Sequence, residues 1–534
     1  MGASFLQLGF AIVLAGVALL LLITVWWAVE FWRNNSALQQ FPWVDVNREE
    51  RFPKFKAFLR GFSNARDVIE RGYEEYSKKG KMFVTIDQTG RPQVFISPAH
   101  LEEALKFDGT ALDEHSFFPM TIAEKYTFGG YGQPIGINGQ HVVCIRGLTR
   151  NMHRLSEDLS DETQYALGKY WGHEAEWKEV KLVETCKFLT GAVTSRMLVG
   201  QKLCRNEEYL DVSLRWNNSL MLTAGLINLF PDSLQPIVAP LLMIHTKRLT
   251  DQGLKFLAPP AQNRIADRKT HIADKSAGWE EPYDYMKFLL DEPSGFNNCM
   301  DNDPIALARG VMMINAAAFF ASAYGVVNAL LDILSAPAEL DLVAKLRAEC
   351  AAVARDATDN LTSKVGINKL LHLDSVVRES MRYNALDYTA MHRYVKPAEG
   401  FTFSSGEHLP QGTHLVFPSG PYQHEDELYP DGDKFEPFRF SEAKDDAPMH
   451  HVNGPVSAVS TGKYHFPWGI GKSQCPGRFF AVHEIKIILA HILLNYDMKP
   501  LQKRPANTPI GTFALPDEKV TISIRRRVPE KIAS

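Results

Sequence analysis

Residues 466–481 read FPWGIGKSQCPGRFFA. This stretch places one cysteine, Cys475, in a frame of glycine and proline that includes Gly469 and Gly471. Glycine allows a tight turn and a close approach of the backbone to a bulky group. The following residues 477–497 show the pattern of an amphipathic helix, so Cys475 lies at or just before a helix N-terminus. The N–H groups and the helix dipole there favour a thiolate, which is either a nucleophile or a soft metal ligand.

The two roles of a thiolate need different partners. A nucleophile needs a base, and the nearest histidines, His465 and His483, belong to no recognisable Cys/His signature. One cysteine without further ligands cannot form a tetrahedral zinc site. A single axial thiolate to haem iron needs only one protein ligand, and the N–H groups of a glycine turn temper the charge on the sulfur. The frame therefore favours a haem site.

Composition and charge exclude other classes of protein. The chain has 534 residues, 45% of them hydrophobic, and a formal net charge of −4. A nucleic-acid-binding protein would carry a strongly basic face, so no nucleic-acid partner is expected. The six cysteines have no CxxC spacing, which indicates a reducing compartment without disulfides.

The N-terminus predicts a membrane anchor. Residues 5–29 carry no charge, and a span needs about 20 apolar residues. Lys and Arg are absent before this segment and frequent from Arg33 onward, which places the body of the protein in the cytosol. A cleaved signal peptide is the alternative, but it would have a basic start and a shorter apolar run. We expect a single-pass anchor at 1–32 in the membrane of the endoplasmic reticulum and a haem-binding domain at 33–534.

The rest of the chain predicts one helix-rich domain with small sheets, mainly α in an α+β arrangement. Helical periodicity dominates from about 148 to 383, for example over 168–199, and strand-like pieces lie near 81–97, 401–410 and 520–527. Residues 305–334 form a helix that is apolar on all sides, which indicates a buried core helix or, as the alternative, a second membrane span.

Four motifs in order resemble the cytochrome P-450 superfamily. They are the loop 468–477, with Trp468 where most members have Phe, the Glu379-Ser-Met-Arg382 sequence, the FEPFRF segment at 435–440, and the central apolar helix. The resemblance covers the chain after the anchor and implies the fold of that superfamily. Finer similarity is to fungal secondary-metabolism members such as gibberellin and indole-diterpene oxidases.

The resemblance also implies a cofactor and a set of site residues. The cofactor is haem b, iron protoporphyrin IX, with Cys475 as the axial ligand of the iron. Gly469 and Gly471 belong to the same haem-binding loop. A buried ion triad with a structural role is implied by three further charged residues, namely Glu379, Arg382 and Arg439.

Two departures from the family pattern concern the chemistry. Where the central helix usually carries an acid followed by threonine, this chain has Phe320 and Ala321. Ser322 is the remaining hydroxyl for proton delivery, and the substrate's own hydroxyls are the alternative. Ser473 stands where Arg or His normally contacts a haem propionate. Other cations are candidates for that contact, namely Lys472, Arg393, His141 and Arg146.

The implied function is a membrane-bound haem-thiolate monooxygenase, an oxidoreductase that uses O2 and electrons from an NADPH-cytochrome reductase. No flavin or nicotinamide motif is present in the sequence. The expected substrate is a small hydrophobic natural product, such as a terpenoid, an indole alkaloid or a polyketide. By the resemblance, its pocket would be apolar and lined by residues 117–130, 386–391 and 513–516, together with Phe319, Phe320 and Ser322. The alternative is a haem-thiolate isomerase or dehydratase that needs no reductase.

Overall fold

The computed structural model describes residues 38–47, 49–128, 142–273, 279–292, 302–442 and 456–527. They form two compact units. The first unit combines the N-terminal part up to Ala123 with residues 224–242 and 391–418, and the second contains the remainder. The predicted anchor at 5–29 lies outside the described residues.

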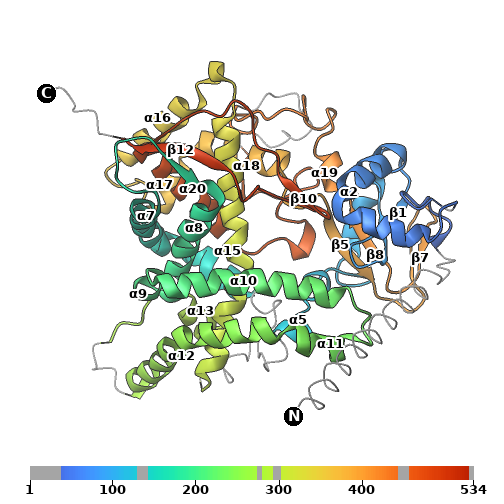
Figure 1. Ribbon diagram of the computed structural model, residues 1–534, viewed down its shortest axis with the longest axis horizontal. Helices are drawn as coiled ribbons and strands as arrows, with labels where there is room; N and C mark the ends of the chain where they lie inside the picture. Colours follow the sequence, from blue (N-terminus) through green and yellow to red (C-terminus); the bar gives the residue numbers. More distant parts are fainter. Residues whose placement is uncertain are drawn as a thin grey trace, which may run out of the picture. The chain divides into compact units, whose positions relative to one another are not determined.

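The first unit is built on a five-stranded sheet in the order β1-β2-β8-β5-β3 (Figure 1). Strands β1 and β2 form an antiparallel hairpin, and β8 pairs with β2 in parallel. The strands are β1 (Phe83–Ile86), β2 (Pro92–Phe95), β3 (Leu112–Asp113), β5 (Ala390–Val395) and β8 (His414–Phe417), with the small pair β6 (Phe401–Thr402) and β7 (His408–Leu409). The helices are α2 (Pro53–Glu75), α3 (Pro98–Lys106), α4 (Phe117–Thr121) and α11 (Gln235–Leu242).

The second unit is mainly helical. Its principal helices are α7 (Arg150–Trp171), α8 (Leu182–Val199), α10 (Glu207–Asn228, whose last turn belongs to the first unit), α12 (Ile244–Ala273), α13 (Tyr285–Asp291), α15 (Pro304–Leu334), α16 (Leu342–Ala354), α18 (Leu371–Tyr383) and α20 (Arg478–Asn495). Shorter helical pieces are α5 (Glu124–Thr127), η4 (Cys144–Thr149), α9 (Gln201–Cys204), η5 (Ala338–Leu340), α17 (Lys364–Asn368), α19 (Ser419–Tyr422) and η7 (Gly471–Ser473). Two small sheets complete it, β4 (Lys178–Lys181) with β12 (Thr521–Arg526) and β9 (Tyr496–Met498), and β10 (Thr508–Ile510) with β11 (Phe513–Leu515).

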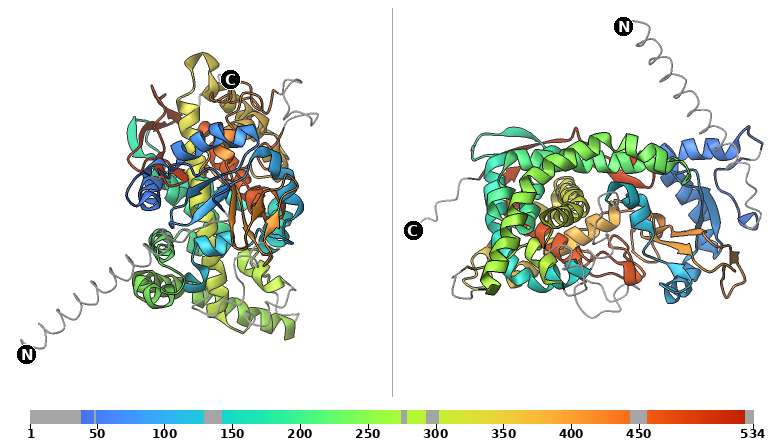
Figure 2. Two further views of the ribbon diagram at one scale, coloured as in Figure 1. Left: turned by 90° about the vertical axis from the view of Figure 1, so that its right-hand side faces the viewer. Right: turned by 90° about the horizontal axis from the view of Figure 1, so that it is seen from below.

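Helix α15 is the centre of this unit. Asp303 caps its start by accepting hydrogen bonds from the N–H groups of Ile305 and Ala306 at 2.8 and 3.1 Å. The helix packs against α8, α12, α18 and α20, and the right-hand view of Figure 2 shows it nearly end-on among its neighbours. Within the described part of the chain it alone is long and apolar enough to cross a membrane, but 67% of its most apolar window is buried in the protein. The sequence prediction of a buried core helix is therefore confirmed.

The helical pattern over 168–199 is interrupted, so the prediction of helix is wrong at this point. Helix α7 ends at Trp171, where Gly172 has a φ of 75°, and strand β4 follows before α8 begins. The strand exists because its backbone pairs with β12, for example Val180 with Ile522. That partner is more than 300 residues away in sequence, and local periodicity carries no information about it.

Candidate functional site

The loop before α20 turns back on itself at two glycines. Gly469 and Gly471 have φ values of 70° and 78°, which side-chain-bearing residues rarely adopt. The Cys475 N–H donates to the Trp468 carbonyl oxygen at 2.7 Å, and the Gly469 N–H donates to the Phe466 carbonyl oxygen at 2.7 Å. The two turns fix the position of the cysteine by backbone geometry.

Side chains anchor the same loop to the segment that precedes it. The indole Nε1 of Trp468 donates to the Ala458 carbonyl oxygen at 2.7 Å. Arg478, the first residue of α20, donates from Nη1 to the Cys475 carbonyl oxygen at 2.8 Å and from Nε to the Val459 carbonyl oxygen at 3.2 Å. The cysteine is therefore held from both sides, and the start of α20 is part of the support.

The sulfur of Cys475 lies in a distinct environment. Cys475 as a residue is half-buried, whereas the other described cysteines, Cys144, Cys186, Cys204 and Cys350, are buried. Burial raises the pKa of the Cys475 thiol, and the N–H groups of Gly477 and Arg478, with the Arg478 guanidinium, act in the opposite direction. A Cβ atom placed on Gly477 would lie 4.0 Å from the Cys475 Sγ. A cysteine at the edge of the core, with N–H donors directed at its sulfur, fits the role of a single thiolate ligand to haem iron.

The charged residues Glu379, Arg382 and Arg439 form a buried ion triad. The Arg382 Nε and Nη2 donate to the two carboxylate oxygens of Glu379, each at 2.8 Å, and the Arg439 Nε donates to Glu379 Oε1 at 3.0 Å. The two members on α18 are 0% exposed and Arg439 is 8% exposed. Both guanidinium groups also bind backbone carbonyls between residues 423 and 434, which ties α18 to the segment before the cysteine loop.

The two exposed positions of α15, Ala317 and Ala321, carry neither a hydroxyl nor an acid. Ala317 and Ala321 are exposed, although most of the helix around them is buried. They are one turn apart and therefore share a face. A stripe of methyl groups is suited to contact with an apolar ligand, and it offers no proton donor.

The surroundings of Phe320, which stands where the family usually has an acid, are aromatic and cationic. Its ring stacks on Tyr324 with centroids 5.9 Å apart, and the Lys187 ammonium lies 5.3 Å from its centroid. Lys187 is itself paired with Glu518. The side chain thus takes part in a cation–π cluster between α8 and α15.

Ser322 faces a carboxyl group that the sequence reasoning missed. Glu484 on α20 is 0% exposed, and its Oε1 accepts a hydrogen bond from Thr194 Oγ1 at 2.7 Å. Burial raises the pKa of Glu484 to about 7, while the hydroxyls of Ser322 and Thr194 lower it. The signal in the sequence that could have identified Glu484 is its place as the single acid in the mostly apolar segment RFFAVHEIKIILAHILL. Charged residues are rarely fully buried unless they are paired.

The candidate propionate-binding cations lie in different surroundings. Arg393, in the first unit, donates to Asp108 from Nε at 2.6 Å and from Nη2 at 3.0 Å, and it is 2% exposed. Arg146 on η4 is paired with Glu292 and its side chain is 50% exposed. Lys472 is exposed and Ser473 is half-buried, and His141 lies outside the described residues.

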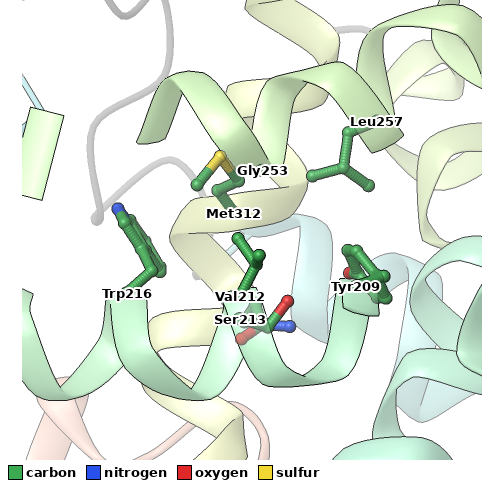
Figure 3. A pocket seen from close by; sticks show the side chains of 8 residues that line it. Tyr209, Val212, Ser213, Trp216, Gly253, Leu257 and Met312 are labelled. Atoms are coloured by element: carbon green, nitrogen blue, oxygen red, sulfur yellow. The ribbon is translucent and has the colours of Figure 1, made fainter. Parts of the chain in front are cut away.

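A pocket of the second unit lies between α10, α12 and α15 (Figure 3). Its lining is mostly apolar, and its members are Tyr209, Val212, Ser213, Trp216, Gly253, Leu257, Met312 and Asn315. Burial raises the pKa of Tyr209 to about 12, so this phenol stays neutral near pH 7. The pocket therefore contributes shape and hydrogen bonding but no acid–base group. None of its members belongs to the segments expected to line a substrate site.

Comparison with known proteins places these features in a family. The cytochrome P-450 family model matches residues 55–524, and the chain belongs to this family. The cytochrome P-450 monooxygenase gloP of Glarea lozoyensis is 28% identical over 93% of this chain and 92% of its own length. Monooxygenase astC of Aspergillus terreus is 28% identical over 99% of this chain and its full length, and monooxygenase 151 of Postia placenta is 30% identical over 88% of this chain and 90% of its own length.

Membership of the family defines the class of reaction. The chain is an oxidoreductase of the cytochrome P-450 type, and its cofactor is haem. When bound, the haem supplies the reductive activation of O2. The family implies a redox partner that delivers the electrons.

Proposed function

We propose that Cys475 is the axial thiolate ligand of the haem and that the chain is a membrane-anchored monooxygenase of fungal secondary metabolism. The observation that carries the proposal is the Cys475 sulfur itself. Among the described cysteines, Cys475 is the one residue that is not fully buried, and two backbone N–H groups and a guanidinium lie close enough to its sulfur to stabilise the thiolate. Gly469 and Gly471 hold the loop in the required turn. Lys472, which is exposed in the same loop, is the cation we propose for contact with a haem propionate.

The substrate we propose is a small hydrophobic natural product, such as a terpenoid, an indole alkaloid or a polyketide. The alanine face of α15 supports an apolar ligand, since Ala317 and Ala321 present methyl groups to the open side. The monooxygenase names of the fungal relatives support oxygenation over the isomerase or dehydratase alternative. An NADPH-cytochrome reductase at a membrane, reached through the anchor at 1–32, is the proposed source of electrons.

The axial ligand is tested by spectroscopy of the reduced, carbon-monoxide-bound protein. We expect the wild type to show the red-shifted Soret band of a thiolate-ligated haem, and Cys475→Ser to lose this band. Cys350→Ser is the matched control, because Cys350 is a buried cysteine on α16, and it should keep the band. A folded Cys475→Ser protein that retains the band would refute the assignment.

The reaction type is tested with candidate substrates, the reductase and isotopically labelled oxygen. A monooxygenase should consume NADPH in step with product and place one labelled oxygen atom in it. Turnover of a substrate at an equal rate without NADPH would contradict the proposal and point to isomerase or dehydratase chemistry.

A further inference from the structure

A buried ion pair joins the C-terminal end of α15 to two other segments of the second unit. Asp332 on α15 is 3% exposed, and its carboxylate accepts a hydrogen bond from Arg504 Nε at 2.5 Å. The Asn384 Nδ2 donates to both carboxylate oxygens at 2.9 Å, and Ser380 Oγ donates to Oδ2 at 2.5 Å. The Arg504 Nη2 also donates to Asn328 Oδ1 at 2.8 Å. These five side chains, the Asp332 cluster, connect α15, the end of α18 and the chain that leads into β10.

The charge of the Asp332 cluster is balanced within it. Burial raises the pKa of Asp332 to about 6, and Arg504 acts in the opposite direction. The carboxyl group is therefore mostly ionised at pH 7, and Arg504 is its counter-charge. The neighbouring acid and base of α18, Glu379 and Arg382, bind each other instead. A buried ion pair often adds little net stability compared with apolar side chains, but in some proteins it selects one arrangement of the chain.

The two segments that the cluster holds also bind each other. In the chain after α18, the Tyr388 N–H donates to the Thr512 carbonyl oxygen at 3.0 Å, and the Leu386 carbonyl oxygen accepts from the Ala514 N–H at 2.9 Å. The partners of this segment belong to the hairpin of β10 and β11, and Arg504 lies just before that hairpin. The contacts therefore form a closed circuit that begins and ends at the ion pair.

The hairpin carries exposed apolar side chains at its tip. Ile510 and Phe513 pair across a two-residue turn, and they are 51% and 37% exposed. Gly511 in this turn has a φ of 60°, a conformation that glycine adopts without strain. Phe513 lies in one of the segments expected to line the substrate pocket, and Leu386 lies in another. Apolar side chains on a hairpin that is already fixed suit an apolar ligand, because less entropy is lost on binding.

We propose that Asp332 and Arg504 are positioning residues that determine the substrate specificity of this monooxygenase. Their ion pair fixes the hairpin of β10 and β11 against the segment after α18, and so it sets which shape of apolar substrate fits beside Phe513. The inference rests on the proposed function, because it takes residues 386–391 and 513–516 as part of the substrate pocket. A ligand large enough to reach the hairpin depends on the ion pair, whereas a ligand that occupies only the iron does not.

Azole binding to the full-length haem-loaded protein tests the proposal. Clotrimazole is a bulky apolar azole and imidazole is a small one, and both shift the Soret band when a ring nitrogen binds the iron. We expect Asp332→Asn and Arg504→Gln to raise the dissociation constant of clotrimazole several-fold and to leave that of imidazole unchanged. The double variant should bind clotrimazole no more weakly than the weaker single variant, because both substitutions break the same contact.

The matched control is Asp497→Asn. Asp497 on β9 is also an acid paired with arginines, namely Arg347 and Arg525, but it belongs to neither of the two segments. This variant should bind both azoles as the wild type does. If Asp332→Asn and Arg504→Gln fail to incorporate haem, Asn384→Ala serves instead, because it removes one donor and leaves the ion pair in place. It should raise the dissociation constant of clotrimazole by a smaller factor.

Three outcomes would overturn the proposal. They are unchanged clotrimazole binding in the charge-removing variants, an equal loss for both azoles, and an unchanged value in Asn384→Ala where that variant decides. If Phe513→Ala weakens clotrimazole binding and the cluster variants do not, the pocket lining is supported and the positioning role is refuted. Loss of the thiolate Soret band from the carbon-monoxide complex of the wild type would instead contradict the proposed function, so the two failures are distinguishable.

Discussion

Glu379 is a carboxylate that two guanidinium groups hold away from water. Arg382 binds both of its oxygens, and Arg439 and the N–H of Glu436 bind Oε1. Removing one partner of such a buried ion pair destabilises the fold, because the remaining charges are then buried without a counter-charge. The charged groups therefore fix the position of α18 relative to the segment that leads into the cysteine loop.

Replacing Glu379 by Gln should lower the free energy of unfolding by about 3–5 kcal/mol, since two buried guanidinium groups lose their counter-charge. Urea unfolding followed by tryptophan fluorescence measures the change. Glu436→Gln is the control, because the Glu436 side chain is 48% exposed and its 3.5 Å contact with Arg439 is a surface ion pair. We expect a change within about 1 kcal/mol there. Equal midpoints for both variants would show that the buried triad does not stabilise the fold.

At the scale of elements, the packing of α8 on α15 depends on one missing side chain. Gly191 on α8 leaves space for the ring of Phe319 on α15, which is 0% exposed. A Cβ atom on Gly191 would lie 2.4 Å from the Phe319 Cζ. Thr194, three residues further along α8, donates a hydrogen bond to the carboxyl group of Glu484 on α20.

Gly191→Ala should therefore destabilise the protein by about 1–3 kcal/mol, because the buried ring must move from a well-packed position. The double variant with Phe319→Leu should recover part of the loss, and thermal unfolding measures both. Gly225→Ala on α10 is the control, since no atom lies within 4 Å of the added Cβ. It should be neutral or stabilising by about 0.4–1 kcal/mol. A Gly191→Ala protein as stable as this control would refute the steric argument.

For the whole molecule, histidines buried between helices set a limit on acid stability. His483 and His491 on α20 bind Ser156 and Ser160 on α7, each at 2.8 Å. Burial lowers the pKa of His483 to about 3 and that of His491 to about 4, with contributions from nearby Lys and Arg side chains. In the unfolded chain both rings have a pKa of about 6.5.

The unfolded state thus binds more protons than the folded state below about pH 6.5, and stability must fall as the pH is lowered toward the folded pKa values. We expect a loss of roughly 1–2 kcal/mol per histidine between about pH 7 and about pH 5. Urea unfolding at the two pH values measures it. His483→Gln should show a smaller loss than the wild type, whereas His153→Gln, at an exposed site on α7, should show the same loss. An identical pH dependence in all three proteins would contradict the assignment.

The sequence predicted the elements whose signals are local. The core helix expected at 305–334 is observed at Pro304–Leu334, and the helix expected after the cysteine is α20. The strands expected near 81–97 and 520–527 are β1, β2 and β12. These predictions succeeded because apolar periodicity and glycine turns act over a few residues.

Other features could not be found in this way. The Glu-x-x-Arg spacing at 379–382 fits an exposed surface pair equally well, and its burial follows from chain segments folded over it from residues 423 to 439. Glu484 carries no motif, and its relation to Ser322 and Thr194 arises from three helices that are distant in sequence. Strand β4 forms because its backbone pairs with β12, which is distant in sequence.

The family, the haem cofactor and the class of reaction follow from the amino-acid sequence, because the turn around Cys475 and the order of the motifs are encoded locally. The tertiary structure decided which polar groups lose contact with water. Packing placed alanines on the open face of α15 and directed Ser322 to a buried acid, since both the burial of a charge and its pKa depend on neighbours that only the folded chain brings together.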